Sequence, residues 1–214
     1  LDYRSLRVVP NGVAAPEMTP TARSLELAQA LPTSPDRFVV GCVARFAEVK
    51  RPLLWIECAA AIYAKCPEAY FVMVGHGPLL EAVAARAEAL GLRDRLILTG
   101  VTRDVGYWFS QMDVHLLLSR YEGLPNVLIE AQMCGVPVVT TPAGGSAEAL
   151  APGVTGTVLD SVETVDPRQV ADAVLAWRCD ANARAMLRET LCDWATSRFS
   201  VERMLELTVQ IYME

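Results

Sequence analysis

Short apolar runs alternate with amphipathic stretches along most of this chain. The apolar runs are rich in β-branched residues, and they are FVVGCV (38–43), YFVMV (70–74), RLILT (95–99), VHLLL (114–118), VPVVTT (136–141) and TGTVL (155–159). The stretches between them, such as 52–66 and 78–92, have helical spacing and good helix formers. Apolar strands that alternate with helices are typical of a parallel sheet covered on both faces. We therefore predict an α/β fold with a Rossmann-like, doubly wound parallel sheet.

The two ends of the chain depart from this pattern. Residues 11–36 are rich in Pro, Ala, Ser and Thr and contain one short helical stretch, TARSLELAQAL. After Arg178 the pattern is helical to the end, and Ser200 is the expected N-cap of the last helix. We predict three parts, which are an interdomain connecting segment (1–35), the sheet domain (36–178) and a pair of C-terminal helices (179–214).

The composition fits a large globular domain and narrows the choice of ligand. Of the 214 residues, 52% are hydrophobic and 21% are charged, so the chain can bury a sizeable core. The 19 Lys and Arg residues against 25 Asp and Glu residues give a net charge of −6. This balance argues against a nucleic-acid binder that relies on a broad basic face. An anionic ligand must instead meet a local cluster of cations.

The cysteines and histidines give no sign of a metal site. The 6 cysteines lie mostly within apolar runs, and no pair has CxxC spacing. We interpret them as reduced, buried thiols of a cytoplasmic protein. Only 2 histidines occur, and His115 lies in the apolar run VHLLL. No apolar run approaches the roughly 18 residues of a membrane span.

Polar and glycine-rich segments follow each of the first five predicted strands. In chain order they are ARFAEVKRP, GHGP, GVTRD, SRYEGLPN and TPAGGS. In a parallel sheet all strand-to-helix loops open on the same edge, which is where open α/β sheets bind ligands. The sequence therefore predicts that these segments converge on one crevice.

The first two of these loops offer cations and close backbone approach. Arg45 and Lys50 supply a planar fork of donors and a mobile point charge, both suited to phosphate oxygens. Two surface cations on an exposed turn are the plainer interpretation. Gly75 and Gly77 allow the backbone to approach a ligand closely, although an ordinary strand-to-helix turn explains them equally well.

The fourth loop leads into a helix with a predicted anion site. Pro125 at or near the first helical position and Gly135 beyond the end frame a helix of about ten residues. We expect the free amides of its first turn, around Asn126 to Leu128, to face the crevice and bind an anion.

Two glutamates bracket the start of this helix. Glu130, inside the helix, can accept two hydrogen bonds from a vicinal diol such as that of a ribose. Glu122 precedes the helix, where a carboxylate would compete with a phosphate, so we expect it to face a neutral, hydroxyl-rich sugar. Either glutamate alone could be a helix-capping acid or part of a solvent-exposed face. These roles explain poorly why both glutamates flank Gly-Leu-Pro-Asn.

These segments resemble a known family. RFAEVKRP, VGHGPLLEAV, LTGV and EGLPNVLIEAQMCGVPVVTTPAGGSAE are similar to the C-terminal, donor-binding domain of retaining GT-B glycosyltransferases of family 4 (group 1). Glu122 and Glu130 match the paired glutamates of that family. The resemblance runs from about Val9 to Asp160. Ala44 stands where the family often has Gly, and His76 where an acidic residue is common.

The resemblance implies an enzyme that transfers a sugar, with retention at the anomeric carbon, from a nucleotide diphosphate sugar. We expect a UDP-sugar donor and a carbohydrate or lipid-linked acceptor, in polysaccharide or lipopolysaccharide synthesis. The implied catalytic residues are Arg45, Lys50 and Glu122. The implied donor-binding residues are Glu130, Gly123, Leu124, Asn126, Val127, Gly75, Gly77, Val101 and Arg103, with Val101 to Arg103 beside the base. No Asp-x-Asp occurs, so fixed cations and amides, and no metal cofactor, are expected to neutralise the departing diphosphate.

A whole enzyme of this family has two such domains facing across a cleft. We expect the acceptor domain before Leu1, and we expect the last helices to pack back towards it. Any peripheral contact with the inner face of the membrane would belong mainly to that missing half. This chain alone is expected to bind a nucleotide but to turn over poorly.

Two other classes of protein stay open. The first is an NAD-binding domain of an oxidoreductase, but no strand here ends in GxGxxG with an acidic residue about 20 positions later. The second is a non-catalytic module that kept the fold and binds a nucleotide or a protein partner.

Overall fold

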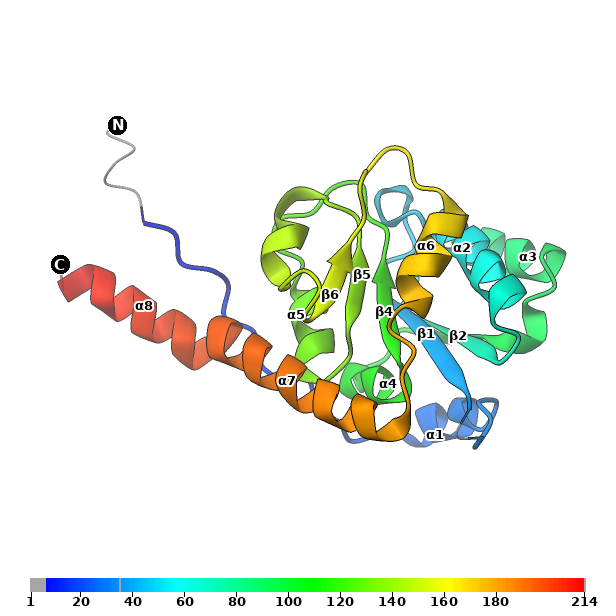
Figure 1. The fold of residues 1–214 in the computed structure, drawn as a ribbon, viewed down its shortest axis with the longest axis horizontal. Coiled ribbons are helices and arrows are strands. Elements are labelled where there is room, and N and C mark those ends of the chain that lie inside the picture. The colour runs from blue at the N-terminus through cyan, green and yellow to red at the C-terminus, as the bar shows by residue number, and fades with distance from the viewer. Residues whose placement is uncertain (1–6, 35, 214) are drawn as a thin grey trace.

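A single parallel sheet forms the centre of the computed structural model, which describes residues 7–34 and 36–213 (Figure 1). Its six strands lie in the order β3-β2-β1-β4-β5-β6, and all neighbouring pairs are parallel. The strands are β1 (Phe38–Val43), β2 (Ala69–Val74), β3 (Leu96–Gly100), β4 (Val114–Leu117), β5 (Val138–Thr140) and β6 (Gly156–Val158). Each falls within or beside a predicted apolar run. The prediction of a doubly wound α/β fold is confirmed.

Helices cover both faces of the sheet (Figure 1). They are α1 (Ala22–Ala28), α2 (Pro52–Lys65), α3 (Leu80–Ala89), α4 (Val105–Gln111), α5 (Asn126–Met133), α6 (Pro167–Leu175), α7 (Ala181–Phe199) and α8 (Val201–Met213). Successive residues of β1 alternate between the faces, so that Phe38 and Val40 pack in one core cluster and Val39 in the other. The first cluster contains side chains of α2, α3 and α6, and the second contains side chains of α4, α5 and α7.

His115 is a core residue of the central strand β4. Its Nε2 accepts a hydrogen bond from the backbone N–H of Val43 at 3.2 Å, and its ring packs edge-on against Phe109 with 5.5 Å between ring centroids. The side chain is fully buried, and this burial lowers the pKa of His115 to about 3. His115 is therefore neutral at pH 7, and its ring packs in the core.

We expect His115 to make the fold sensitive to acid. Between pH 6.5 and 3 the unfolded chain binds a proton that the folded chain excludes, so the free energy of unfolding falls as the pH falls. The slope reaches about 1.4 kcal/mol per pH unit, which amounts to about 2 to 3 kcal/mol at pH 4.5. Urea unfolding at pH 7 and pH 4.5 measures this loss. His115→Phe should lose about 2 to 3 kcal/mol less between these pH values than the native chain, and an equal loss in both would contradict the prediction.

The N-terminal connecting segment is fastened to the sheet domain and to α7. Thr21 caps α1, and its backbone N–H donates to Asp104 Oδ2 at 2.7 Å. Burial raises the pKa of Asp104, but hydrogen bonds from Thr102, Thr21 and Ser24 outweigh it and lower that pKa to about 2. Further along, the Val13 N–H donates to the Phe199 carbonyl at 2.7 Å. The segment therefore runs along the sheet domain.

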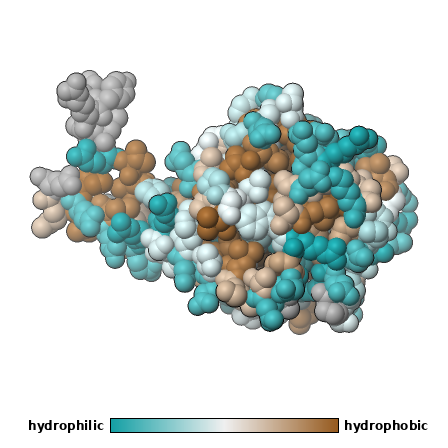
Figure 2. Space-filling view, viewed as in Figure 1, coloured by the Kyte–Doolittle hydropathy of each residue, from teal (hydrophilic) through white to brown (hydrophobic). Residues whose placement is uncertain are grey.

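The last helix projects from the body of the molecule (Figure 1). Ser200 caps it as predicted, because its Oγ accepts from the Arg203 N–H at 3.2 Å. Its apolar side chains include Leu205, Val209 and Tyr212, all exposed, with Tyr212 at 86%. Figure 2 shows hydrophobic side chains gathered on this projecting arm. In the described part of the chain, no helix has the length and apolarity needed to cross a membrane.

The cysteines are free thiols, but not all are buried. Cys42, Cys58 and Cys66 are buried as predicted, whereas Cys134, Cys179 and Cys192 are half-buried. The prediction was wrong for these three, which lie at the C-cap of α5, in the turn before α7 and on α7, where their side chains keep contact with solvent. Burial raises the pKa of Cys42 and Cys58 to about 12, so both stay protonated.

Candidate functional site

The loops after the strands are hydrogen-bonded to one another at the carboxyl edge of the sheet. The bonds that join different loops are Phe46 N–H to His76 O (3.0 Å), Arg120 N–H to Val49 O (2.8 Å), Thr141 Oγ1 to Ser119 O (2.6 Å) and Gly145 N–H to Gly123 O (2.7 Å). The prediction that these loops lie at one edge of the sheet is confirmed, and their convergence on one crevice stays a prediction. Each loop is held by its neighbours, so the side chains on them have fixed relative positions.

Lys50 and Glu122 form an ion pair across this edge. Lys50 is the last residue of a 3-10 turn after β1 (Glu48–Lys50), and Glu122 lies in the loop between β4 and α5. The Lys50 and Glu122 side chains are only 24% and 10% exposed, so solvent screens the pair weakly. The fold thus brings a cation and an acid from two distant loops into contact.

Arg45, in the loop after β1, and Glu130, on α5, have no protein partners among the described residues. Arg45 is exposed, and in the described part of the chain its guanidinium makes no hydrogen bond or ion pair. The Glu130 carboxylate on α5 is likewise unpaired among the described residues, and partial burial raises its pKa. One free cation and one free carboxylate are therefore open to a ligand.

The ends of α5 lie close to their predicted positions, but one amide of its first turn is not free. Pro125 is the N-cap, and the helix from Asn126 to Met133 has 8 residues, because Gly135 leaves the helical region with φ +74°. The Leu128 N–H donates to the Pro125 carbonyl at 3.0 Å, so the expectation that this amide is free was wrong. The amides of Asn126 and Val127 donate to no acceptor in the described ranges. The Asn126 side chain accepts from the Asn11 amide at 3.3 Å.

Gly75 and Gly77 pack against the loop that carries Arg45. Gly75 has φ +135°, and a Cβ there would overlap the Ala44 carbonyl oxygen. A Cβ at Gly77 would overlap the Phe46 carbonyl oxygen, which accepts from the Leu79 N–H at 3.1 Å. The turn interpretation therefore explains both glycines, since the backbone they approach is that of the chain itself. Contact of these residues with a donor stays a prediction.

The glycine pair after β5 supports Glu122, a role that the sequence alone did not assign. Gly144 has φ +53°, and a Cβ there would overlap the Glu122 carbonyl oxygen. The Gly145 N–H donates to the Gly123 carbonyl at 2.7 Å. The sequence signal for this role is the pair of consecutive glycines in the loop after β5. The spacing of residues along the chain does not identify Glu122 as the residue that they contact.

The remaining predicted residues lie in the loop after β3 and directly after Glu122. Val101 and Arg103 are exposed in the loop after β3, which is separated from β1 by β2. Gly123 is exposed, and the half-buried Leu124 borders a hollow of about 400 Å³. Glu148, Phe199 and Arg203 also line this hollow.

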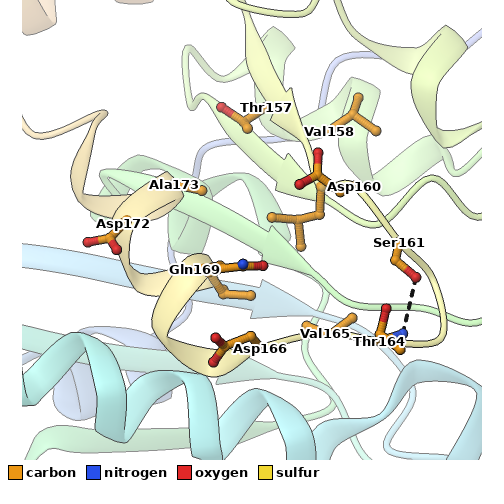
Figure 3. Close-up of a pocket in the computed structure, with 12 residues that line it drawn as sticks. Thr157, Val158, Asp160, Ser161, Thr164, Val165, Asp166, Gln169, Asp172 and Ala173 are labelled. Atoms are coloured by element: carbon orange, nitrogen blue, oxygen red, sulfur yellow. Dashed lines mark hydrogen bonds between the residues drawn. The ribbon is translucent and has the colours of Figure 1, made fainter.

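A separate groove of about 350 Å³ lies between β6 and α6 (Figure 3). It is lined by Asp160, Asp166, Asp172 and Gln169, and by none of the predicted site residues. Asp166 caps α6, and Asp172 pairs with Lys65 at 2.5 Å. Three carboxylates repel an anionic ligand, so this groove does not suit a diphosphate. Within the described ranges, no group of three or more His, Cys, Asp or Glu side chains could hold a metal ion.

Comparison with known proteins gives a family match over most of the sheet domain. Residues 37–180 match the family described as Glycosyl transferases group 1. The Vi polysaccharide biosynthesis protein VipC/TviE of Salmonella typhi is 41% identical over 212 residues, covering 96% of this chain and 36% of that protein. A GDP-mannose-dependent alpha-(1-6)-phosphatidylinositol monomannoside mannosyltransferase of Mycolicibacterium smegmatis is 31% identical, covering 67% of this chain and 43% of that enzyme. The chain thus spans less than half the length of these curated relatives.

The fold is also that of solved glycosyltransferase structures. Anabaena Alr3699/HepE in complex with UDP superposes with a TM-score of 0.75 at 23% identity, covering 91% of this chain and 53% of that one. At this identity the likeness establishes the fold, which is the Rossmann-like half of a GT-B structure.

Proposed function

Because the chain belongs to the group 1 glycosyl transferases, we propose that it is the donor-binding part of an enzyme that transfers a sugar from a nucleotide diphosphate sugar. The observation that carries this proposal is the contact of Lys50 with Glu122 at the carboxyl edge of the sheet. Arg45, in the same loop as Lys50, and Glu130, on the helix that follows Glu122, have no partners among the described residues. The cations suited to a diphosphate lie in the loop after β1, and the acids suited to hydroxyl groups lie in the loop after β4 and on α5.

The proposed donor is a UDP-sugar, and the proposed setting is polysaccharide synthesis. The Salmonella relative is named for Vi polysaccharide biosynthesis, and the Anabaena structure holds UDP. The mycobacterial relative is named as GDP-mannose-dependent, so GDP is the competing choice of nucleotide. The choice of sugar follows from neither name.

We assign the diphosphate to Arg45 and Lys50, together with the free amides of Asn126 and Val127. These groups stabilise the charge that builds on the departing nucleotide, and no metal is required for it. Glu130 accepts hydrogen bonds from the ribose, and the backbone from Val101 to Arg103 borders the base.

The sugar lies against Glu122 and the amides of Gly123 and Leu124. In the proposed retaining reaction of family 4, the bond between the anomeric carbon and the diphosphate oxygen breaks, and the acceptor oxygen bonds to that carbon on the same face. The acceptor proton passes to the departing diphosphate oxygen. A protein nucleophile is not needed for this step.

The acceptor is proposed to bind to the remainder of a longer protein. The match covers only 36% of the Salmonella relative and 43% of the mycobacterial relative, and the exposed apolar face of α8 suits packing against a further domain. We therefore expect little or no transfer by this chain alone, and efficient transfer would refute that expectation. A cytoplasmic location and peripheral membrane contact of the longer protein stay predictions.

Calorimetric titration of this chain with UDP, GDP, ADP and NAD tests the proposal. We expect UDP to bind, with GDP as the next best ligand, and ADP and NAD to bind much more weakly. Binding of NAD without UDP or GDP would instead indicate an oxidoreductase domain. Absence of binding to all four nucleotides would indicate a non-catalytic module.

A further inference from the structure

Arg51 has an unusual backbone conformation beside Lys50. Its φ and ψ are 49° and 52°, and within the described ranges every other residue with positive φ is a glycine. This left-handed conformation costs an L-residue about 1 to 2 kcal/mol. Arg51 is also the N-cap of α2 and has no side-chain capping bond there. Other contacts of the side chain must offset this strain.

The guanidinium of Arg51 donates to backbone carbonyls on two other segments. Its Nε donates to Leu118 O at 2.5 Å, and its terminal nitrogens donate to Val162 O at 2.6 Å and Ser119 O at 3.3 Å. Leu118 and Ser119 follow directly after β4, and Val162 lies in the loop between β6 and α6. The planar guanidinium of arginine carries five N–H donors in a fixed fork, which suits bonds to several carbonyls at once.

These bonds join the chain beside Lys50 to the chain that leads to Glu122. Ser119 lies three residues before Glu122, and its carbonyl also accepts from Thr141 Oγ1 at 2.6 Å. The Arg120 N–H donates to Val49 O at 2.8 Å and forms a second link between the same loops. Three backbone carbonyls accept hydrogen bonds from the Arg51 guanidinium, so this side chain links the loops. The neighbouring Lys50, and not Arg51, is the side chain that would bind the ligand.

We propose that Arg51 is a positioning residue that fixes Lys50 opposite Glu122, and so places the Lys50 ammonium for a nucleotide diphosphate. The role in ligand binding rests on the proposed function, whereas the role in fixing the ion pair does not. Glycine at this position would relieve the backbone strain and remove the three hydrogen bonds. Arg51→Gly therefore separates loss of positioning from loss of stability.

The ion pair can be observed without any ligand. The chain contains two lysines, Lys50 and Lys65, so labelling with ¹⁵N-lysine gives two side-chain ammonium signals. Lys65 pairs with Asp172 on the surface, at the opposite end of α2 from Arg51, and serves as an internal control. We expect Arg51→Gly to shift the Lys50 signal and to speed its hydrogen exchange, while the Lys65 signal stays unchanged. An unchanged Lys50 signal would overturn the proposal.

The effect on ligand binding is measured by UDP calorimetry, with Arg184→Ala as the matched control. Arg184 pairs with Asp113 at 2.9 Å next to the start of β4, which is the opposite edge of the sheet. We expect Arg51→Gly to weaken UDP binding at least tenfold, and Arg184→Ala to lower the melting temperature while changing the UDP Kd less than twofold. UDP binding by Arg51→Gly within twofold of native would overturn the binding role. If the native chain binds no UDP, the proposed function fails, and the lysine signals still decide whether Arg51 fixes the pair.

Discussion

Lys50→Ala is expected to weaken UDP binding by this chain about 10- to 100-fold. A hydrogen bond to a charged group contributes about 1.5 to 3 kcal/mol, which corresponds to this range in Kd. The variant also leaves the Glu122 carboxylate, which is only 10% exposed, without its partner and close to the expected position of the diphosphate. Calorimetry at constant ionic strength measures the change.

Glu122→Gln should have the opposite effect on the free nucleotide. In the ligand-free chain Lys50 is paired with Glu122, so a diphosphate must compete with the carboxylate for the ammonium. Removing the negative charge frees Lys50, and we expect UDP to bind a few-fold more tightly, by about 0.5 to 1 kcal/mol. Lys65→Ala, which breaks the exposed pair with Asp172, is the control and should leave the Kd unchanged. A Kd for Lys50→Ala that matches the Kd of this control would contradict the assignment.

Gly144→Ala is expected to destabilise the fold by at least about 3 kcal/mol. The left-handed backbone at φ +53° costs an alanine about 1 to 2 kcal/mol, and the added Cβ overlaps the Glu122 carbonyl oxygen, so the loop must move. Because that loop carries Glu122, UDP binding should weaken as well. Urea unfolding monitored by circular dichroism gives the change in free energy.

Gly153→Ala separates the cost of the backbone strain from the cost of the Cβ overlap. Gly153 has φ +76°, and a Cβ there meets no atom within 4 Å, so only the backbone strain of about 1 to 2 kcal/mol applies. UDP binding should be unaffected in this variant. Equal destabilisation by Gly144→Ala and Gly153→Ala would show that overlap of the added Cβ with the Glu122 loop does not lower the free energy of unfolding.

The sequence predicted the features that depend on local pattern. The apolar runs placed the strands, and the glycine-rich and charged segments after them placed the loops at one edge, because the periodicity of side chains reports which elements form. The sequence also placed the start of α8 at Ser200, where a hydroxyl caps the helix. These features can be recognised from residues that lie close together in the sequence.

Contacts between distant loops could not be predicted in the same way. Arg45 and Lys50 looked equivalent in the sequence, yet Lys50 pairs with Glu122 and Arg45 has no partner among the described residues. The strained Arg51 and the packing of Gly144 on Glu122 also depend on side-chain and backbone geometry across segments. In the same way, the hydrogen bond from the Leu128 N–H to the Pro125 carbonyl, three residues earlier, depends on the backbone geometry of the first turn of α5.

A crystal structure of this chain with bound UDP would show directly whether the two cations hold the diphosphate. We expect the diphosphate to lie within hydrogen-bonding distance of Lys50 Nζ and the Arg45 guanidinium, with the ribose hydroxyls on Glu130. A nucleotide bound in the groove between β6 and α6, or a diphosphate out of reach of both cations, would contradict it.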